Sequence, residues 1–138
     1  MMKIETCKLY TREEVSSHPN KLYIFGENST QKETSVIGGG QAVIRGLPNT
    51  FGLCTLTSIG NPWSDDSFES NKTTIDMDVF YLKEKAKNYE TIVFPEQGLG
   101  TGRACLQKFA PKTMMYLCSK LLNEFNYNNL ENLISKYF

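Results

Sequence analysis

Two glycine clusters constrain this chain most, because each lies between an apolar run and a segment of helical character. The first, at residues 38–40, follows the apolar run at residues 22–25, and the second, at residues 98–102, follows the run at residues 91–94. A strand, a glycine loop and a helix N-terminus in this order allow backbone N–H groups to surround a phosphate. Two such loops predict a ligand with two phosphates or two sugars held from both sides, and therefore favour a nucleotide.

The composition is that of one globular domain, which we expect to span residues 1–138. Hydrophobic residues make up 40% and charged residues 22% of the 138 residues, so the chain is long and apolar enough to bury a core. Fifteen basic and fifteen acidic residues give a formal net charge of zero, which does not favour a nucleic-acid partner.

The cysteine and histidine content argues against a metal centre. The four cysteines form no Cys-x-x-Cys pair and His18 is the one histidine, so we expect neither a metal site nor a cofactor. The cysteines are interpreted as reduced core residues. The first residues contain no apolar signal region and no run reaches membrane-spanning length, so we expect a cytoplasmic protein without a membrane partner. The sequence leaves a homo-oligomer open.

Strand-like and helix-like segments alternate along the chain. Strands are expected at residues 3–10, 22–25, 51–58 and 91–94, and helices after Thr11, at residues 75–88, at residues 103–125 and, after a turn, within residues 126–138. Thr73 or Thr74 is expected to cap the helix at 75–88, and Pro111 marks a break in the next one. This alternation predicts an α/β fold, a single three-layer α/β/α domain with a largely parallel or mixed sheet. Ligands of such sheets bind beyond the carboxyl ends of the strands, where both glycine clusters would emerge.

The first glycine cluster is followed by a candidate site residue, Arg45. Three consecutive glycines are costly in backbone entropy, and they are useful where the backbone approaches a ligand closely. Arg45 lies one helical turn beyond Gln41 and would face the same site. The alternative is a tight turn that packs against a neighbouring element.

The second glycine cluster differs from the common nucleotide-binding motifs. Its G-x-G-T-G spacing at residues 98–102 matches neither the G-x-G-x-x-G pattern nor the P-loop pattern, which argues against dinucleotide oxidoreductases and P-loop NTPases. We expect the N–H groups of residues 99–102 to form an anion-binding nest. The Thr101 hydroxyl would donate to the ligand and Arg103 would reach a phosphate.

Polar residues end the strand that precedes the first cluster. Asn28 offers both a donor and an acceptor to a ribose hydroxyl, and Glu27 is a candidate general base or ribose ligand. The alternatives are an Asx turn at Asn28 and a surface carboxylate at Glu27. Asp65 and Asp66, in a polar stretch, are interpreted as solvated carboxylates.

The order of these features resembles the macro-domain family. A strand that ends at Asn28, followed by Gly-Gly-Gly-Gln-Ala-Val-Ile at residues 38–44, is similar to that family's strand-end asparagine and first glycine-rich loop. Phe-Pro-Glu-Gln-Gly-Leu-Gly-Thr-Gly at residues 94–102 is similar to its second, diphosphate-wrapping loop. Macro domains bind ADP-ribose and its derivatives, and some hydrolyse them. The resemblance implies a distal ribose near Asn28 and residues 38–40, and a diphosphate on residues 98–102.

The chain also resembles small phage-encoded proteins. They share Phe-Gly-x-Asn at residues 25–28, Gly-Gly-Gln-Ala-x-Ile-Arg at residues 39–45 and the Phe-Pro to Gly-Thr-Gly stretch at residues 94–102. This resemblance implies a protein that binds a phosphorylated nucleotide and sequesters a nucleotide immune signal of the host. Two alternatives stay open: a hydrolase of ADP-ribose derivatives, and a structural or protein-binding module whose glycines only form turns.

The candidate site residues fall into two groups. The catalytic candidates, which would hold a water molecule, are Glu27, Asn28 and Gln41. The ligand-binding candidates are Gly26, Gly38, Gly39, Gly40, Ala42, Arg45, Pro95, Gly98, Leu99, Gly100, Thr101, Gly102 and Arg103.

Overall fold

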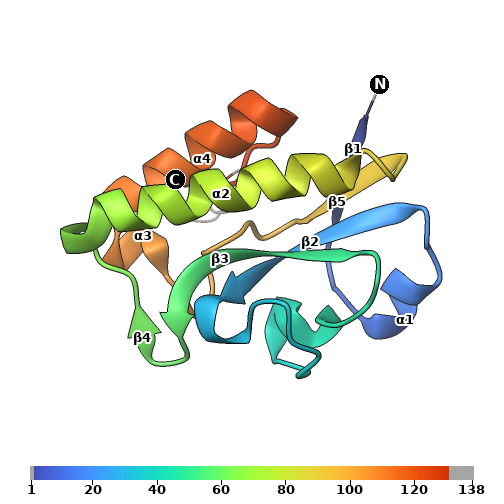
Figure 1. Cartoon of the computed structure of the whole chain (residues 1–138), viewed down its shortest axis with the longest axis horizontal. Coiled ribbons are helices and arrows are strands. Elements are labelled where there is room, and N and C mark those ends of the chain that lie inside the picture. Colours follow the sequence, from blue (N-terminus) through green and yellow to red (C-terminus); the bar gives the residue numbers. More distant parts are fainter. Residues whose placement is uncertain (1, 131–138) are drawn as a thin grey trace.

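The computed structural model describes residues 2–130, and its centre is a five-stranded sheet (Figure 1). The strands lie in the order β1 (Lys3–Cys7), β5 (Thr91–Pro95), β2 (Lys21–Asn28), β3 (Thr50–Ser58) and β4 (Asn61–Pro62). The first four pair in parallel, and β4 is antiparallel to β3. The predicted α/β fold with a largely parallel sheet is therefore confirmed. The first strand ends at Cys7, earlier than expected.

Helices cover both faces of the sheet, but unequally (Figure 1). The elements of the helical layers are α1 (Arg12–Ser16), α2 (Phe68–Ala86), α3 (Leu106–Phe109), α4 (Pro111–Phe125) and the 3-10 helix η2 (Gly40–Ile44). The two long helices, α2 and α4, pack their buried residues against one face, in the larger core. Val15 of α1 and Ile44 of η2 pack on the opposite face in a smaller core. Each sheet face is thus buried, as expected for parallel strands.

The long helices differ from the predicted ones at their starts. Helix α2 begins at Phe68, because Ser64 caps a 3-10 turn, Asp65–Ser67, that continues directly into it. The hydroxyls of Thr73 and Thr74 bond to carbonyls within the helix, so the prediction that they cap it is wrong.

The predicted helix at residues 103–125 is divided. A turn runs to Cys105, α3 is short, and α4 starts with Pro111 at its first position, where a missing N–H costs nothing. Asn126, in the left-handed conformation, ends α4. The terminal helix expected near the end of the chain lies outside the described residues. Among residues 2–130, the helices are all too short or too polar to cross a membrane.

Asp65 anchors the start of α4 and is not a solvated carboxylate. Its two carboxylate oxygens accept hydrogen bonds from the N–H groups of Lys112 and Thr113, at 2.8 and 2.9 Å, and from the Thr113 hydroxyl at 2.9 Å. Desolvation raises the pKa of Asp65, but these hydrogen bonds lower it by more, so the pKa lies below the ordinary value. The ionised form is therefore favoured by folding.

Replacing Asp65 by asparagine is expected to lower the free energy of unfolding by about 1 kcal/mol at pH 7, because both carboxylate oxygens accept N–H groups and the amide keeps one acceptor oxygen. A folded pKa below the unfolded one stabilises the protein above the unfolded pKa, which is about 4. That stabilisation is lost as the pH falls through the folded pKa. Urea unfolding over a series of pH values from 7 downward measures it, with Asp66→Asn as the matched control. An effect that does not decline as the pH falls, or an equal effect of the control, would contradict this role.

Candidate functional site

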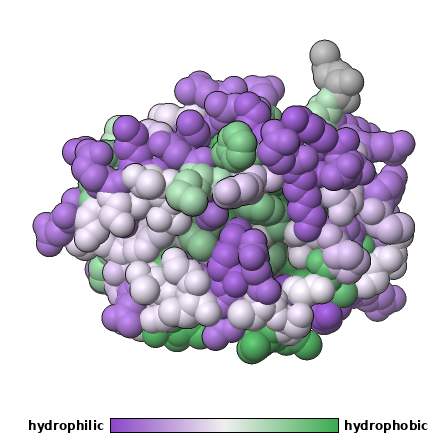
Figure 2. Space-filling view, viewed as in Figure 1, coloured by the Kyte–Doolittle hydropathy of each residue, from purple (hydrophilic) through white to green (hydrophobic). Residues whose placement is uncertain are grey.

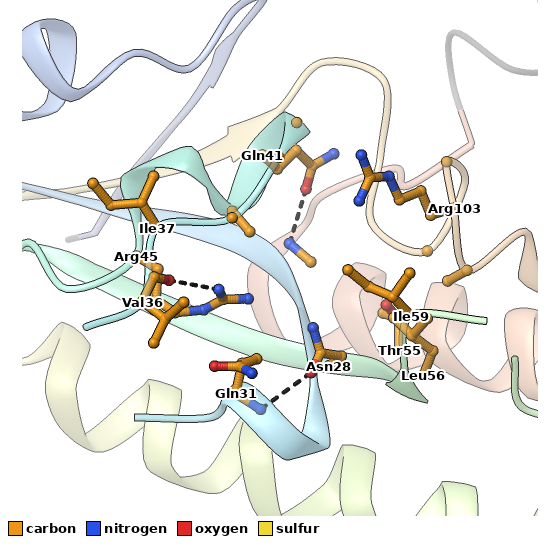
Figure 3. A pocket seen from close by; sticks show the side chains of 18 of the residues that line it. Asn28, Gln31, Val36, Ile37, Gln41, Arg45, Thr55, Leu56, Ile59 and Arg103 are labelled. Carbon is orange, nitrogen blue, oxygen red and sulfur yellow. Dashed lines mark hydrogen bonds between the residues drawn. The ribbon is translucent and has the colours of Figure 1, made fainter. Parts of the chain in front are cut away.

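A cavity of about 350 Å³ opens beyond the carboxyl ends of β2 and β5 (Figure 3). Because these strands are parallel neighbours, the segments that follow them meet at one edge of the sheet. Both glycine clusters line the cavity, and β3 contributes Thr55 and Leu56 to its wall. The two clusters, about 60 residues apart in the chain, are therefore brought together as the fold class predicts.

The first cluster leads into η2, a 3-10 helix of five residues. The prediction of an α-helix N-terminus at this position is wrong, because the chain turns away after Ile44. The N–H groups of Gly39, Gly40 and Gln41 donate no hydrogen bond to another described residue. Backbone donors are therefore present at this wall of the cavity, but without an aligned helix behind them.

Gln41 joins three segments of the site. Its Oε1 accepts a hydrogen bond from the Gly26 N–H of β2 at 2.8 Å, and its Nε2 donates to the Gly98 carbonyl at 3.0 Å. The amide thus connects β2, the first cluster and the second cluster. Gln41 therefore holds the two loops and β2 together.

The second cluster is shaped by close packing. Gly98 and Gly100 have φ of 90° and 77°, which side-chain-bearing residues rarely adopt. A Cβ at Gly98 would lie 2.2 Å from the Asn129 carbonyl oxygen, and one at Gly100 would lie 2.6 Å from Leu106 Cδ1. These glycines are therefore required by the fold itself, apart from any ligand.

Part of the predicted anion nest is occupied by the protein. The Leu99 N–H donates to Asn129 Oδ1 at 2.7 Å, and the Asn129 amide returns a bond to the Leu99 carbonyl at 2.9 Å. The Thr101 hydroxyl donates to the Gln97 carbonyl at 2.9 Å. Among the described residues, the N–H groups of Gly100, Thr101 and Gly102 have no acceptor. The nest is thus reduced to three N–H groups.

Arg103 brings a positive charge to the space between the two clusters. Its side chain is exposed and makes no ion pair or hydrogen bond with residues 2–130. A Cβ at Gly39 would lie 2.9 Å from its Nη2, so the guanidinium rests against the first cluster. Figure 3 shows it pointing across the cavity toward Gln41. No carboxylate of the described residues therefore competes with an anion for this charge.

Glu27 and Arg45 form a buried ion pair beneath the cavity. Arg45 Nε donates to Glu27 Oε2 at 2.8 Å, and Nη2 donates to Oε1. The Glu27 side chain is 1% exposed and the Arg45 side chain is 5% exposed. Arg45 Nη1 also donates to the Val36 carbonyl at 2.7 Å. Glu27 does not line the cavity, so the residue predicted as a general base or ribose ligand is an internal counter-ion.

Asn28 forms an Asx-type turn, which was the alternative to its predicted role as a ribose ligand. Its Oδ1 accepts from the Gln31 N–H at 3.1 Å and from the Thr30 hydroxyl at 2.7 Å. The Nδ2 has no partner among the described residues, and Figure 3 shows it on the cavity side. Asn28 therefore presents a donor to the cavity, and its acceptor is in use.

The structure gathers most of the predicted residues around one cavity. Those that line it are Gly26, Asn28, Gly38, Gly39, Gly40, Gln41, Ala42, Arg45, Gly100, Gly102 and Arg103. Those that do not are Glu27, Pro95, Gly98, Leu99 and Thr101. Lining residues that sequence reasoning missed are Gln31, Val36, Ile37, Thr55, Leu56, Ile59, Gln97 and Ala104. One indication of Val36 and Ile37 was present in the sequence, namely that they directly precede the first glycine cluster. There was none for Thr55 and Leu56, whose pattern is that of ordinary strand residues.

The chemistry of this lining favours an anion. Its charged side chains are Arg45, which is neutralised by Glu27, and Arg103, which has no counter-ion among residues 2–130. The described lining contains no carboxylate, histidine, cysteine or lysine. Residues 2–130 also contain no cluster of three or more metal-ligating side chains. The cavity can therefore bind negative charge but presents no ordinary general base.

Comparisons with known proteins identify one relationship. Neither the curated proteins nor the solved structures include a significant match to this chain. A family described as "Family of unknown function (DUF7831)" matches residues 5–120, a range that contains both glycine clusters and all the residues that line the cavity. The chain belongs to the DUF7831 family.

Proposed function

We propose that this protein binds a phosphorylated nucleotide, of the ADP-ribose type or a related one, in the cavity between its two glycine clusters. The observation that carries the proposal is the Arg103 guanidinium, which lies against Gly39 and has no ion-pair or hydrogen-bond partner among residues 2–130. Backbone N–H groups of both glycine clusters likewise lack an acceptor in that part of the chain. The cavity, at about 350 Å³, is within the range of about 300–1,000 Å³ that is usual for small-ligand sites.

Several hydrogen-bond donors at the cavity have no acceptor among the described residues. Asn28 presents its Nδ2, Arg103 its guanidinium, and the clusters their N–H groups, whereas the Asn28 and Gln41 amide oxygens already accept bonds. A ligand rich in acceptor oxygens and negative charge satisfies this set. Phosphate groups have both properties and bind readily to such backbone cradles.

Retention of the ligand is favoured over turnover. Glu27, which lies between the lining residues Gly26 and Asn28 in the chain, is buried and bonded to Arg45, and the Gln41 amide bonds to Gly26 and Gly98. Hydrolysis assisted by a side-chain base would need a group that the described lining does not offer. A protein of this kind would sequester its nucleotide, and the resemblance to phage-encoded proteins suggests a nucleotide signal of host immunity as the ligand.

A thermal-shift screen followed by mass spectrometry tests the proposal. The protein is incubated with ADP-ribose, NAD and cyclic nucleotides, separated from free ligand, denatured, and the released small molecules are identified. A ligand at 100 times its Kd would stabilise the native state by about 2.7 kcal/mol, which raises Tm by about 5–10 °C in a chain of this length.

The expected result is a rise in Tm with at least one nucleotide and its recovery intact, at one equivalent per chain. Recovery of cleavage products would contradict sequestration and support the hydrolase. No rise in Tm with any nucleotide would overturn nucleotide binding and leave the glycines as structural turns.

A further inference from the structure

Three exposed aliphatic residues stand at the cavity opposite one another. Val36 and Ile37 lie on one side and Ile59 on the other (Figure 3), with exposed fractions of 57%, 59% and 70%. Figure 2 shows hydrophobic residues at the surface along its lower edge, where Figure 1 places the connection between β2 and β3. Exposed apolar groups that converge on a cavity are typical of a binding surface.

Both aliphatic walls are held in place by the fold. The Val36 carbonyl accepts from Arg45, so the buried ion pair with Glu27 also fixes this segment. Ile59 lies in the tight connection between β3 and β4, where Gly60 has φ of 85° and Asn61 bonds to the Ser58 hydroxyl at 2.8 Å. The two walls are therefore preformed.

The amide groups of the lining offer little that distinguishes one base edge from another. The Asn28 oxygen already accepts two bonds from the protein, and the Gln41 oxygen accepts from the Gly26 N–H at the glycine end. The Asn28 Nδ2 is a donor, and every common base carries an acceptor that can satisfy it. Thr55 lies at the glycine end, beside Gly26 and Gly100, and Gln97 belongs to the second cluster. Discrimination between bases needs hydrogen bonds to their edges, because stacking alone accepts every base.

We propose that Val36, Ile37 and Ile59 form a nucleobase subsite that tolerates different bases, so that the protein selects its ligand by the phosphates and not by the base. The inference rests on the proposed function and specifies its ligand class: nucleoside diphosphates and their derivatives, with any of the common bases. The base is packed between aliphatic side chains while Arg103 and the glycine clusters hold the diphosphate.

Calorimetric titration with ADP, GDP, CDP, UDP and inorganic pyrophosphate tests the inference. The four nucleotides are expected to have Kd values within about threefold of one another, and pyrophosphate to bind about tenfold more weakly, since it lacks the apolar contact. A preference of tenfold or more for one base would overturn the inference and leave nucleotide binding intact. Absence of binding by all five compounds would overturn the proposed function together with the inference.

A substitution separates apolar packing from phosphate binding. Ile59→Ser is expected to raise the Kd of all four nucleotides by a similar factor, about three- to tenfold, and to leave the Kd of pyrophosphate unchanged. Leu9→Ser is the matched control, because Leu9 is 73% exposed and does not line the cavity. Weaker binding of one nucleotide alone would show that the subsite distinguishes between bases. An equal loss of pyrophosphate binding would show that Ile59 does not act through the base.

Discussion

Replacing Glu27 by alanine is expected to lower the free energy of unfolding by about 3–5 kcal/mol, a large part of the stability of a small domain. The substitution leaves the Arg45 guanidinium buried, at 5% exposure, with its counter-ion removed. It also releases the Asn28 N–H, which donates to Glu27 Oε1 at 2.9 Å. Urea unfolding followed by circular dichroism at pH 7 measures the change.

Two further variants separate the buried pair from surface electrostatics. Glu84→Ala removes a carboxylate that pairs with Lys87 at the surface, and it is expected to cost less than about 1 kcal/mol. The double variant Glu27→Met with Arg45→Met removes both charges, and it should be more stable than Glu27→Ala because no unpaired charge stays buried. A cost for Glu27→Ala as small as that of Glu84→Ala would show that Arg45 is solvated without its partner.

Replacing Arg103 by alanine is expected to weaken nucleotide binding by about 10- to 100-fold, the usual effect of losing hydrogen bonds between charged groups. Because Arg103 is exposed and makes no ion pair or hydrogen bond with other described residues, the free energy of unfolding should change by less than about 0.5 kcal/mol. Titration calorimetry with ADP-ribose and ADP measures the Kd, and urea unfolding the stability. Arg103→Lys should retain part of the affinity, since it keeps the charge but loses the planar fork.

Lys108→Ala is the matched control for the loss of one positive charge. Lys108 is exposed on the neighbouring helix α3 and does not line the cavity, so its loss should change Kd by less than about threefold. If Arg103→Ala binds nucleotides as tightly as Lys108→Ala, the phosphates do not lie between the two glycine clusters. Gly100 is a less suitable test position, because a side chain there would collide with Leu106 and disturb the fold.

The strands were predictable because their signal is local. The apolar runs at residues 22–25, 51–58 and 91–94 became β2, β3 and β5, and their alternation with helices predicted parallel pairing. That pairing in turn placed both glycine clusters at one edge of the sheet. Helix starts were less predictable, because several residues before α2 are able to cap a helix. In the structure Ser64 caps a 3-10 turn, and that turn continues into α2.

Contacts between distant residues had no counterpart in local patterns. Asp65 caps a helix that starts 46 residues later, at Pro111, and Asn129 holds Leu99 from 30 residues away. Glu27 pairs with Arg45, which is 18 residues further along the chain. Because of this pairing Glu27 is an internal counter-ion and not the general base that was predicted. A side chain's protonation and reach depend on what surrounds it in space, which spacing along the chain does not specify.

The sequence by itself determined the α/β layering and the meeting of two glycine clusters beyond the strand ends, because strand formation and parallel pairing follow from short apolar runs and their alternation with helices. Only the tertiary structure decided which polar groups at that edge are free. It joined Glu27 to Arg45 and Gln41 to Gly26 and Gly98, and it gave Arg103, at the cavity, no partner among residues 2–130. The physical reason is that hydrogen bonds and charges are satisfied by whichever partner the folded chain brings within about 3 Å.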